Sequence, residues 1–345
     1  MPVVEPLSPV RVLVTGAGGP AAIAVLRALA PDATVTLLAA DMDPWAAGLF
    51  LVPAPERVLV PAGDAPEFVD ALLAACRARQ VGLVVPTVDA ELVPLARRVD
   101  EFERAGIRLL LPSAEALEMT LDKLLLARAC HHLVRVPRTE LADSTDPASW
   151  SYPVIVKPRR GSGSRGVALV ASAEQLSALL PAPDLLVQEH LPGQEYSVDV
   201  LADHQGVVHA AVPRVRQRVD SGVSVAGYTL NDPELEQFAR RVVEALDLPY
   251  VANVQIRRDA EGRPALLEVN PRVPGTLALT VAAGVDMARL AVDACRGAVL
   301  PAQLAHRPVA LVRYLEDHVV ELDDLPAEVG PLPGTAGRLS ELAPA

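Results

Sequence analysis

Lysine is almost absent from this chain, and cysteine and aromatic residues are scarce. Of the 31 basic residues, 29 are arginine and only two are lysine, Lys123 and Lys157. Aromatic residues make up 3% of the chain, and the three cysteines are Cys76, Cys130 and Cys295. An odd, widely separated set of cysteines on apolar helical patterns argues against a disulfide framework or a zinc site. It indicates buried structural thiols.

The scarcity of lysine gives weight to the two that remain. The bias toward Ala, Pro and Arg suggests a coding preference that replaces surface lysine with arginine wherever either serves. A compact ammonium differs from a planar guanidinium, and gripping a phosphate as a point charge is one setting where the difference matters. We therefore interpret Lys123 and Lys157 as positions where arginine does not suffice, with chance as the alternative for either one alone.

Long apolar runs and an excess of positive charge are also missing. No stretch approaches the ~20 uncharged apolar residues of a membrane span, and the N-terminal residues lack the basic start of a signal peptide. A net charge of -12 argues against general nucleic-acid binding. We therefore expect a cytoplasmic protein with no membrane and no nucleic-acid partner. Its 345 residues, 51% of them hydrophobic, are enough for two or three domains.

From 10 to 112, apolar strand patterns alternate with helical patterns, which predicts a parallel sheet with helices on its faces. The first turn, TGAGGP at 15–20, has glycine spacing that does not fit a dinucleotide-binding fingerprint, although Asp41 supplies the acid that such a site needs. Asp89 and Glu91 follow the fourth strand at the carboxyl edge, where open sheets bind ligands. They are candidates for holding a substrate amine, and a role as helix N-terminal acids explains them equally well.

The segment around Lys157 predicts an anion-binding loop. An apolar strand delivers Lys157, Pro158 ends that strand, and the loop GSGSRG at 161–166 leads into the next strand. Glycines let the backbone close over an anion with its N–H groups pointing inward, and the lysine supplies charge. The alternative is a flexible hairpin tip.

A strand, a short turn and a second strand follow in DLLVQEHLPGQEYSVDVLAD. Gln188, Glu189 and Leu191 precede the turn, and Glu195 comes just after it. At a domain crossing, a segment of this kind can offer main-chain groups to a base and a carboxylate to ribose hydroxyls.

Arg214 and Arg216 lie two residues apart in a predicted strand at 207–217 and therefore share one face. Two guanidinium groups repel unless an anion lies between them, so we expect an anion to bind at this face. The strand leads into a predicted small-residue loop at 221–227 that could admit a substrate. The alternative is a pair of solvent-facing arginines bound to Asp or Glu.

The run RPALLEVNPRVPGT at 263–276 carries candidate metal ligands. Its apolar first half predicts a strand that pairs with the preceding strand through the DAEG turn as an antiparallel hairpin. Glu268 and Asn270 project from one face, and the parity of the turn decides whether Gln255 joins them. This oxygen-only set suits magnesium when a ligand's phosphates supply the remaining charge, and Arg272 could meet the same anion. The alternative is the charged end of an ordinary edge hairpin.

In their order along the chain, these motifs resemble those of ATP-grasp enzymes, most closely the carbamoyl-phosphate-synthase-like branch, where NVQ and E-x-NPR mark the same hairpin. The resemblance covers residues 10 to 317 and implies an α/β chain. An N-terminal Rossmann-like pre-ATP-grasp domain would span 1–112, and a two-part α+β ATP-grasp fold would follow. Its lid subdomain would span 113–191, and its C-terminal subdomain would span 192–345, with a strand at 308–317 and a Pro- and Gly-rich tail.

The resemblance also implies a role for most of the candidate residues. Arg272 would be a catalytic residue that steadies the transferred phosphoryl group. Lys157, Arg214 and Arg216 would also be catalytic, with the two arginines at the acyl-phosphate or carboxylate end of the cleft. The ATP-binding residues would be Lys123, Lys157, Gly161, Ser162, Gly163, Ser164, Gln188, Glu189, Leu191 and Glu195. Magnesium would bind to Gln255, Glu268 and Asn270. Many ATP-grasp ligases carry an acid where this chain has Gln255, so a second magnesium would be held more weakly.

The implied activity is the ATP-dependent joining of a carboxylate to an amine through an acyl phosphate, with release of ADP and phosphate. ATP and Mg²⁺, or Mn²⁺ in its place, would be the cofactors. Small-molecule, amino-acid-like carboxylates and amines would be the partners, and a homodimer is left open. The alternatives are carboxyphosphate chemistry like that of carbamoyl-phosphate synthase, a noncatalytic nucleotide-binding protein, and a nicotinamide enzyme that uses the TGAGGP turn. The lack of a second ATP-grasp copy argues against a full synthase.

Overall fold

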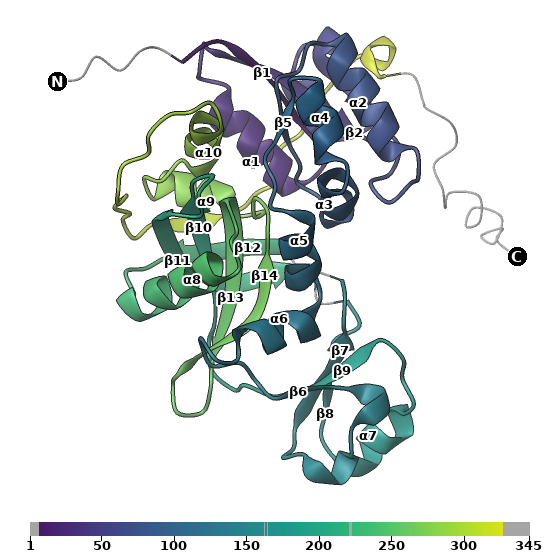
Figure 1. The fold of residues 1–345 in the computed structure, drawn as a ribbon, viewed down its shortest axis with the longest axis vertical. Helices are drawn as coiled ribbons and strands as arrows, with labels where there is room; N and C mark the ends of the chain where they lie inside the picture. The colour runs from purple at the N-terminus through teal and green to yellow at the C-terminus, as the bar shows by residue number, and fades with distance from the viewer. Residues whose placement is uncertain (1–6, 162, 164, 221–222, 327–345) are drawn as a thin grey trace, which may run out of the picture.

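The structure is a computed structural model that describes residues 7–161, 163, 165–220 and 223–326. Figure 1 shows three parts built around three sheets, with the smallest part projecting from one end. The N-terminal part is α/β and the other two are built on antiparallel sheets, as the sequence predicts.

The N-terminal sheet is parallel in every pairing, with strand order β3-β2-β1-β4-β5. Successive residues of β1 belong to different apolar clusters on the two faces of the sheet, which is why its strands read as continuous apolar runs. The strands are β1 (Val10–Val14), β2 (Val35–Asp41), β3 (Arg57–Leu59), β4 (Leu83–Val85) and β5 (Arg108–Leu109). The helices are α1 (Pro20–Leu29), η1 (Ala47–Leu51), η2 (Ala54–Glu56), α2 (Phe68–Ala78), α3 (Asp89–Ala96) and α4 (Val99–Arg104).

One apolar cluster joins elements that lie far apart in the sequence. Val12 and Val14 of β1 and the buried face of α1 share it with α9 (Leu277–Ala282) and α10 (Met287–Cys295). Figure 1 shows these helices stacked beside α1. Because they share one core, the N-terminal sheet and the C-terminal helices are held in a fixed arrangement relative to each other.

The smallest part is a four-stranded antiparallel sheet with order β6-β9-β7-β8. It has its own small core, which includes Trp150 and Leu176. Its elements are β6 (Thr139–Leu141), η3 (Ala142–Ser144), η4 (Pro147–Ser149), β7 (Val154–Pro158), β8 (Ala168–Val170), α7 (Ala173–Leu179) and β9 (Leu185–Glu189).

The third sheet is antiparallel, with order β14-β13-β10-β11-β12-β15. Its strands are β10 (Glu195–Ala202), β11 (Val208–Asp220), β12 (Val223–Thr229), β13 (Tyr250–Arg258), β14 (Pro264–Asn270) and β15 (Ala310–Val312). Helix α8 (Pro233–Ala245) packs on its apolar face together with α5 (Ala114–Leu121) and α6 (Lys123–Cys130). The domain boundaries remain a prediction, but α5 and α6 lie on this sheet rather than on the four-stranded one. A short helix, η5 (Leu322–Asp324), follows β15.

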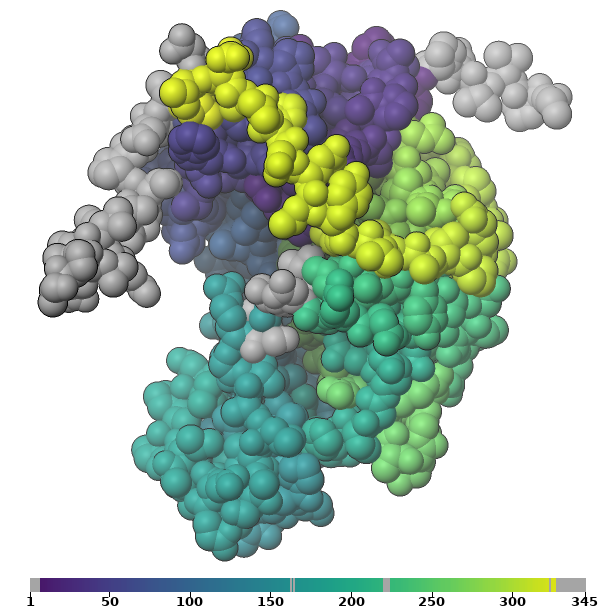
Figure 2. All heavy atoms as spheres, turned by 180° about the vertical axis from the view of Figure 1, so that it is seen from behind, coloured from purple at the N-terminus to yellow at the C-terminus, as the bar shows by residue number. Residues whose placement is uncertain are grey.

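Two predicted elements differ in the structure. The loop predicted at 221–227 is wrong for 223–227, which belong to β12 and pair with β11. A Cβ on Gly227 would lie 2.5 Å from the backbone oxygen of Val215, so a small residue there permits close strand pairing. The strand predicted at 308–317 shortens to three residues, because only Ala310–Val312 pair with β12. The following residues cross the surface to the N-terminal domain (yellow in Figure 2).

Candidate active site

Four neighbouring strands present polar side chains on the face of the third sheet opposite its apolar cluster. The strand period of two puts alternate residues on this face. The register arranges them in two cross-strand rows: Asn270, Asn253 and Asp199 in one, and Glu268, Gln255, Ser197 and Arg214 in the next. This polar face is one wall of the site.

The predicted hairpin is confirmed, and its register answers the open question of Gln255. The connection 259–263 alone would set Gln255 opposite Leu267. A register shift after Gln255 instead sets it opposite Glu268. Gln255, Glu268 and Asn270 therefore lie on one face and line the same cleft.

The donor chemistry of these three residues fits a hard cation such as magnesium, which takes oxygen ligands. Within the described ranges, no group of three or more His, Cys, Asp or Glu side chains forms a metal site. The set provides one carboxylate and two amide oxygens, so phosphate oxygens would have to supply further charge. Whether these residues bind a metal remains a prediction.

Lys123 lies beside Glu268, and Lys157 is buried and bound to Gln188. The Nζ of Lys123 lies 3.8 Å from the Glu268 carboxylate and donates a hydrogen bond of 2.6 Å to the carbonyl of Gly161. Lys157 is 7% exposed and donates a hydrogen bond of 2.8 Å to the Oε1 of Gln188. Burial lowers the Lys157 pKa to about 8, and the carboxylates of Glu268 and Glu195 partly oppose that shift. The structure thus places Lys123 beside the predicted metal ligand, while Gln188 holds Lys157.

The glycine-rich loop needs glycine for its backbone conformation. Gly161 and Gly163 have φ angles of +114° and +72°, in the region that favours glycine. Gly163 and Arg165 line the cleft. Ser162 and Ser164, which the sequence analysis includes among the ATP-binding residues, lie outside the described residues.

The strand that ends at Glu189 has side chains already engaged. The Gln188 side chain accepts the hydrogen bond from Lys157 and donates a hydrogen bond of 2.8 Å to the Thr139 hydroxyl. It therefore orients the lysine. Glu189 binds Arg135 at 2.7 Å, and Leu191 is buried. The main-chain groups of this stretch remain the ones predicted to meet a base.

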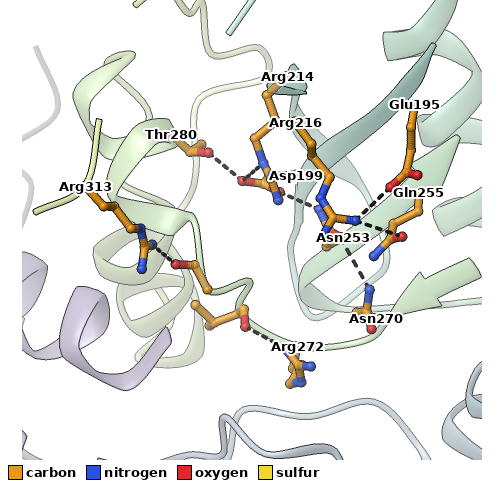
Figure 3. A network of polar contacts seen from close by, with 12 residues as sticks. Glu195, Asp199, Arg214, Arg216, Asn253, Gln255, Asn270, Arg272, Thr280 and Arg313 are labelled. Carbon is orange, nitrogen blue, oxygen red and sulfur yellow. Dashed lines mark hydrogen bonds and ion pairs between the residues drawn. The ribbon is translucent and has the colours of Figure 1, made fainter. Parts of the chain in front are cut away.

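Arg214 and Arg216 share one face, as predicted, and both line the cleft. Arg214 is 3% exposed and binds the carboxylate of Asp199 at 3.2–3.4 Å. Arg216 binds Glu195 at 2.7 Å and the Gln255 side-chain oxygen at 3.5 Å (Figure 3). The alternative was a pair of solvent-facing arginines bound to Asp or Glu. For Arg214 the solvent exposure is wrong, but the acidic partner is present. Glu195, predicted to hold a ribose, is engaged by Arg216.

The N-terminal domain forms the opposite wall of the cleft, whose volume is about 650 Å³. Arg272 donates hydrogen bonds to the carboxylate of Asp89, from the first turn of α3. Glu91, buried beside it, accepts a hydrogen bond from the Thr15 hydroxyl, and burial raises its pKa to about 7. Asp41 accepts a hydrogen bond of 2.7 Å from the Gly18 amide, so its carboxylate closes the glycine turn.

Sequence reasoning missed three polar residues of this site: Asp199 and Asn253, which lie on the polar face, and Thr280, which contacts it. Asp199 interrupts an apolar strand four residues after Glu195, and Asn253 interrupts another two residues before Gln255. That even spacing was a usable signal, because it places them on the same face as known candidates. Thr280, which lies in α9, carried no such signal.

Two family models match the chain. Residues 12–110 match a model described as the N-terminal domain of PylC-like proteins, and residues 181–318 match one described as ATP-grasp in the biosynthetic pathway with Ter operon. The matched segments agree with the N-terminal parallel sheet and with most of the antiparallel part.

Solved structures share the fold. N5-carboxyaminoimidazole synthetase from Staphylococcus aureus, complexed with ADP, is 13% identical with a TM-score of 0.73, covering 90% of this chain and 84% of its own. Biotin carboxylase from Campylobacter jejuni is 17% identical with a TM-score of 0.70, and the match covers 85% of this chain and 72% of the biotin carboxylase chain. Pyruvate carboxylase from Rhizobium etli is 21% identical with a TM-score of 0.69. The match covers 85% of this chain but only 29% of the longer pyruvate carboxylase chain.

No helix in the part of the chain that the structure describes has the length and apolar character required to cross a membrane.

Proposed function

We propose that this chain, which belongs to the ATP-grasp superfamily, is an ADP-forming ligase that joins a carboxylate to an amine. The observation that carries the proposal is the 3.8 Å approach of Lys123 to Glu268, the carboxylate of the hairpin. Cations beside a lone carboxylate and two amide oxygens suit a ligand that brings both phosphates and a metal.

Each residue has a defined task in this proposal. Lys157, fixed by Gln188, and Lys123 would hold phosphate oxygens as point charges, and the glycine-rich loop would cover them. Glu268, Asn270 and Gln255 would hold Mg²⁺, or Mn²⁺ in its place. ATP and the metal, when bound, supply the phosphoryl group and neutralise its charge. The chain itself orients the reactants and excludes water, as phosphoryl transfer requires.

The substrates would lie between the polar face and the N-terminal domain. Arg214 and Arg216 line that space from the sheet, and Asp89 and Glu91 line it from the opposite wall. Arginines on one side and acids on the other support amino-acid-like substrates, which carry both a carboxylate and an amine.

The test is a screen of carboxylates and amines for ADP release with ATP and magnesium. We expect ADP only when both substrates are present, and none from Glu268→Gln at an unchanged melting temperature. Glu261→Gln, whose side chain is 64% exposed at the hairpin turn, is the matched control and should behave as wild type. ATP binding without ADP release from any pair would favour a noncatalytic nucleotide-binding protein.

A further inference from the structure

Asp199 lies in the middle of β10 with no solvent exposure, yet it carries a carboxylate. Three other elements donate to it: Asn253 of β13 at 2.7 Å, Thr280 of α9 at 2.5 Å, and Arg214 of β11 at 3.2–3.4 Å. Figure 3 shows these donors around the carboxylate. A buried carboxylate is tolerated only when donors satisfy it, so the surrounding side chains are fixed in direction as well as in position.

The direction of the Asn253 amide follows from the chemistry of Asp199. An ionised carboxylate accepts hydrogen bonds and cannot donate them. The NH₂ group of Asn253 must therefore face Asp199, which turns the Asn253 carbonyl oxygen toward the next strand. There it accepts a hydrogen bond of 3.4 Å from the Nδ2 of Asn270.

The amide of Asn270 is constrained in the same way. Its NH₂ group is used by the Asn253 oxygen, so its carbonyl oxygen is the group left for the cleft, which Asn270 lines. A cation requires that oxygen and would be repelled by the amide hydrogens. If the Asn253 amide rotated by half a turn, the Asn270 amide would have to rotate with it, and the cleft would lose its oxygen ligand.

We propose that Asp199 and Asn253 are positioning residues that fix the carbonyl oxygen of Asn270 toward the metal. This inference rests on the proposed function, in which Asn270 is a metal ligand. Asp199 also holds Arg214, so one buried carboxylate sets both the metal-binding amide and an arginine of the substrate side. Partners behind a metal ligand commonly change metal affinity by about 10- to 100-fold when they are removed.

The experiment measures Mn²⁺ binding to the full chain by electron paramagnetic resonance, in the presence of a nonhydrolysable ATP analogue. We expect Asn253→Ala to weaken Mn²⁺ binding about 10- to 100-fold, while the affinity for the metal-free analogue is unchanged. Thr120→Val is the matched control, because Thr120 is also buried but donates only to backbone carbonyls of its own helix, α5. It should keep the Mn²⁺ affinity of the wild type even if the melting temperature falls.

A double-mutant cycle separates positioning from a general loss of structure. If Asn253 acts through Asn270, Asn253→Ala should have no further effect on Mn²⁺ affinity in an Asn270→Ala background. An equal loss in both backgrounds would overturn the inference, and so would wild-type affinity in Asn253→Ala. If the wild-type chain with the analogue bound no Mn²⁺, the metal site of the proposed function would fail, and this inference with it.

Discussion

Arg272 and Asp89 are 183 positions apart in the sequence and form a two-pronged ion pair, with N–O distances of 2.5 and 3.0 Å. Arg272 follows the hairpin that carries the metal-ligand candidates, and Asp89 begins a helix of the N-terminal domain. The two side chains are about one-fifth exposed, at 18% and 24%. The N-terminal domain therefore sets the direction of the arginine predicted to act on the phosphoryl group.

Asp89→Asn should lower turnover about 10- to 100-fold with unchanged ATP affinity, because hydrogen bonds to charged groups contribute about 1.5–3 kcal/mol. The amide keeps the size of the side chain but loses the charge that holds Arg272. Steady-state ADP release and nucleotide titration measure the two effects. Glu118→Gln breaks the exposed ion pair with Arg97 and is the control. Wild-type turnover in Asp89→Asn would show that Arg272 needs no anchor.

Lys157→Met should abolish turnover, and Lys157→Arg should restore little of it. The ammonium is buried and bonded to Gln188, so a larger planar guanidinium would overfill the space and leave donors unsatisfied. The measurement is kcat for ADP release. Arg128→Lys, on the exposed side of α6, shows the cost of the reverse exchange at the surface. Substantial activity in Lys157→Arg would remove the significance of the scarce lysines.

Arg214→Ala should destabilise the fold more than Arg216→Ala. Losing Arg214 leaves the fully buried Asp199 carboxylate without its cation, and breaking a buried ion pair costs about 3–5 kcal/mol. The partner of Arg216, Glu195, has a side chain that is 29% exposed and can be hydrated. Urea unfolding measures both losses, and Arg214→Lys should recover part of the first. Equal losses would contradict the burial of Asp199 as the cause.

Arg216→Ala should therefore be the cleaner test of the substrate side, and we expect it to raise the KM for the carboxylate while ATP binding is unchanged.

Glu91→Gln should change how stability depends on pH. Burial raises the Glu91 pKa from 4.5 to about 7, so its neutral form is favoured in the folded state. The stability that the neutral Glu91 carboxyl contributes is fully present below pH 4.5 and is lost as the pH rises through about 7. Relative to the wild type, the free energy of unfolding of the variant should rise by on the order of 3 kcal/mol across this pH window. Urea unfolding at several pH values measures it, with the exposed Glu103→Gln as control. A constant difference between Glu91→Gln and wild type would contradict the shift.

The sequence determined the features that follow from local rules. Apolar runs between helical patterns predicted the parallel sheet, and the even spacing of Glu268 and Asn270 placed them on one face. The burial of all three cysteines is confirmed. The scarcity of lysine pointed to two residues, of which the fold brings Lys123 to Glu268 and buries Lys157. The tasks assigned to the site residues remain predictions.

Only the tertiary structure decided which of these faces meet. The position of Gln255 depended on one extra residue at Leu267, and a one-residue shift moves every later side chain to the other face of a strand. The contacts of Asp89 with Arg272, and of Asp199 with Asn253, join strands and domains that are far apart in the chain. Spacing along a strand fixes which side chains share a face, but which strand lies beside it is set by the packing of the whole core.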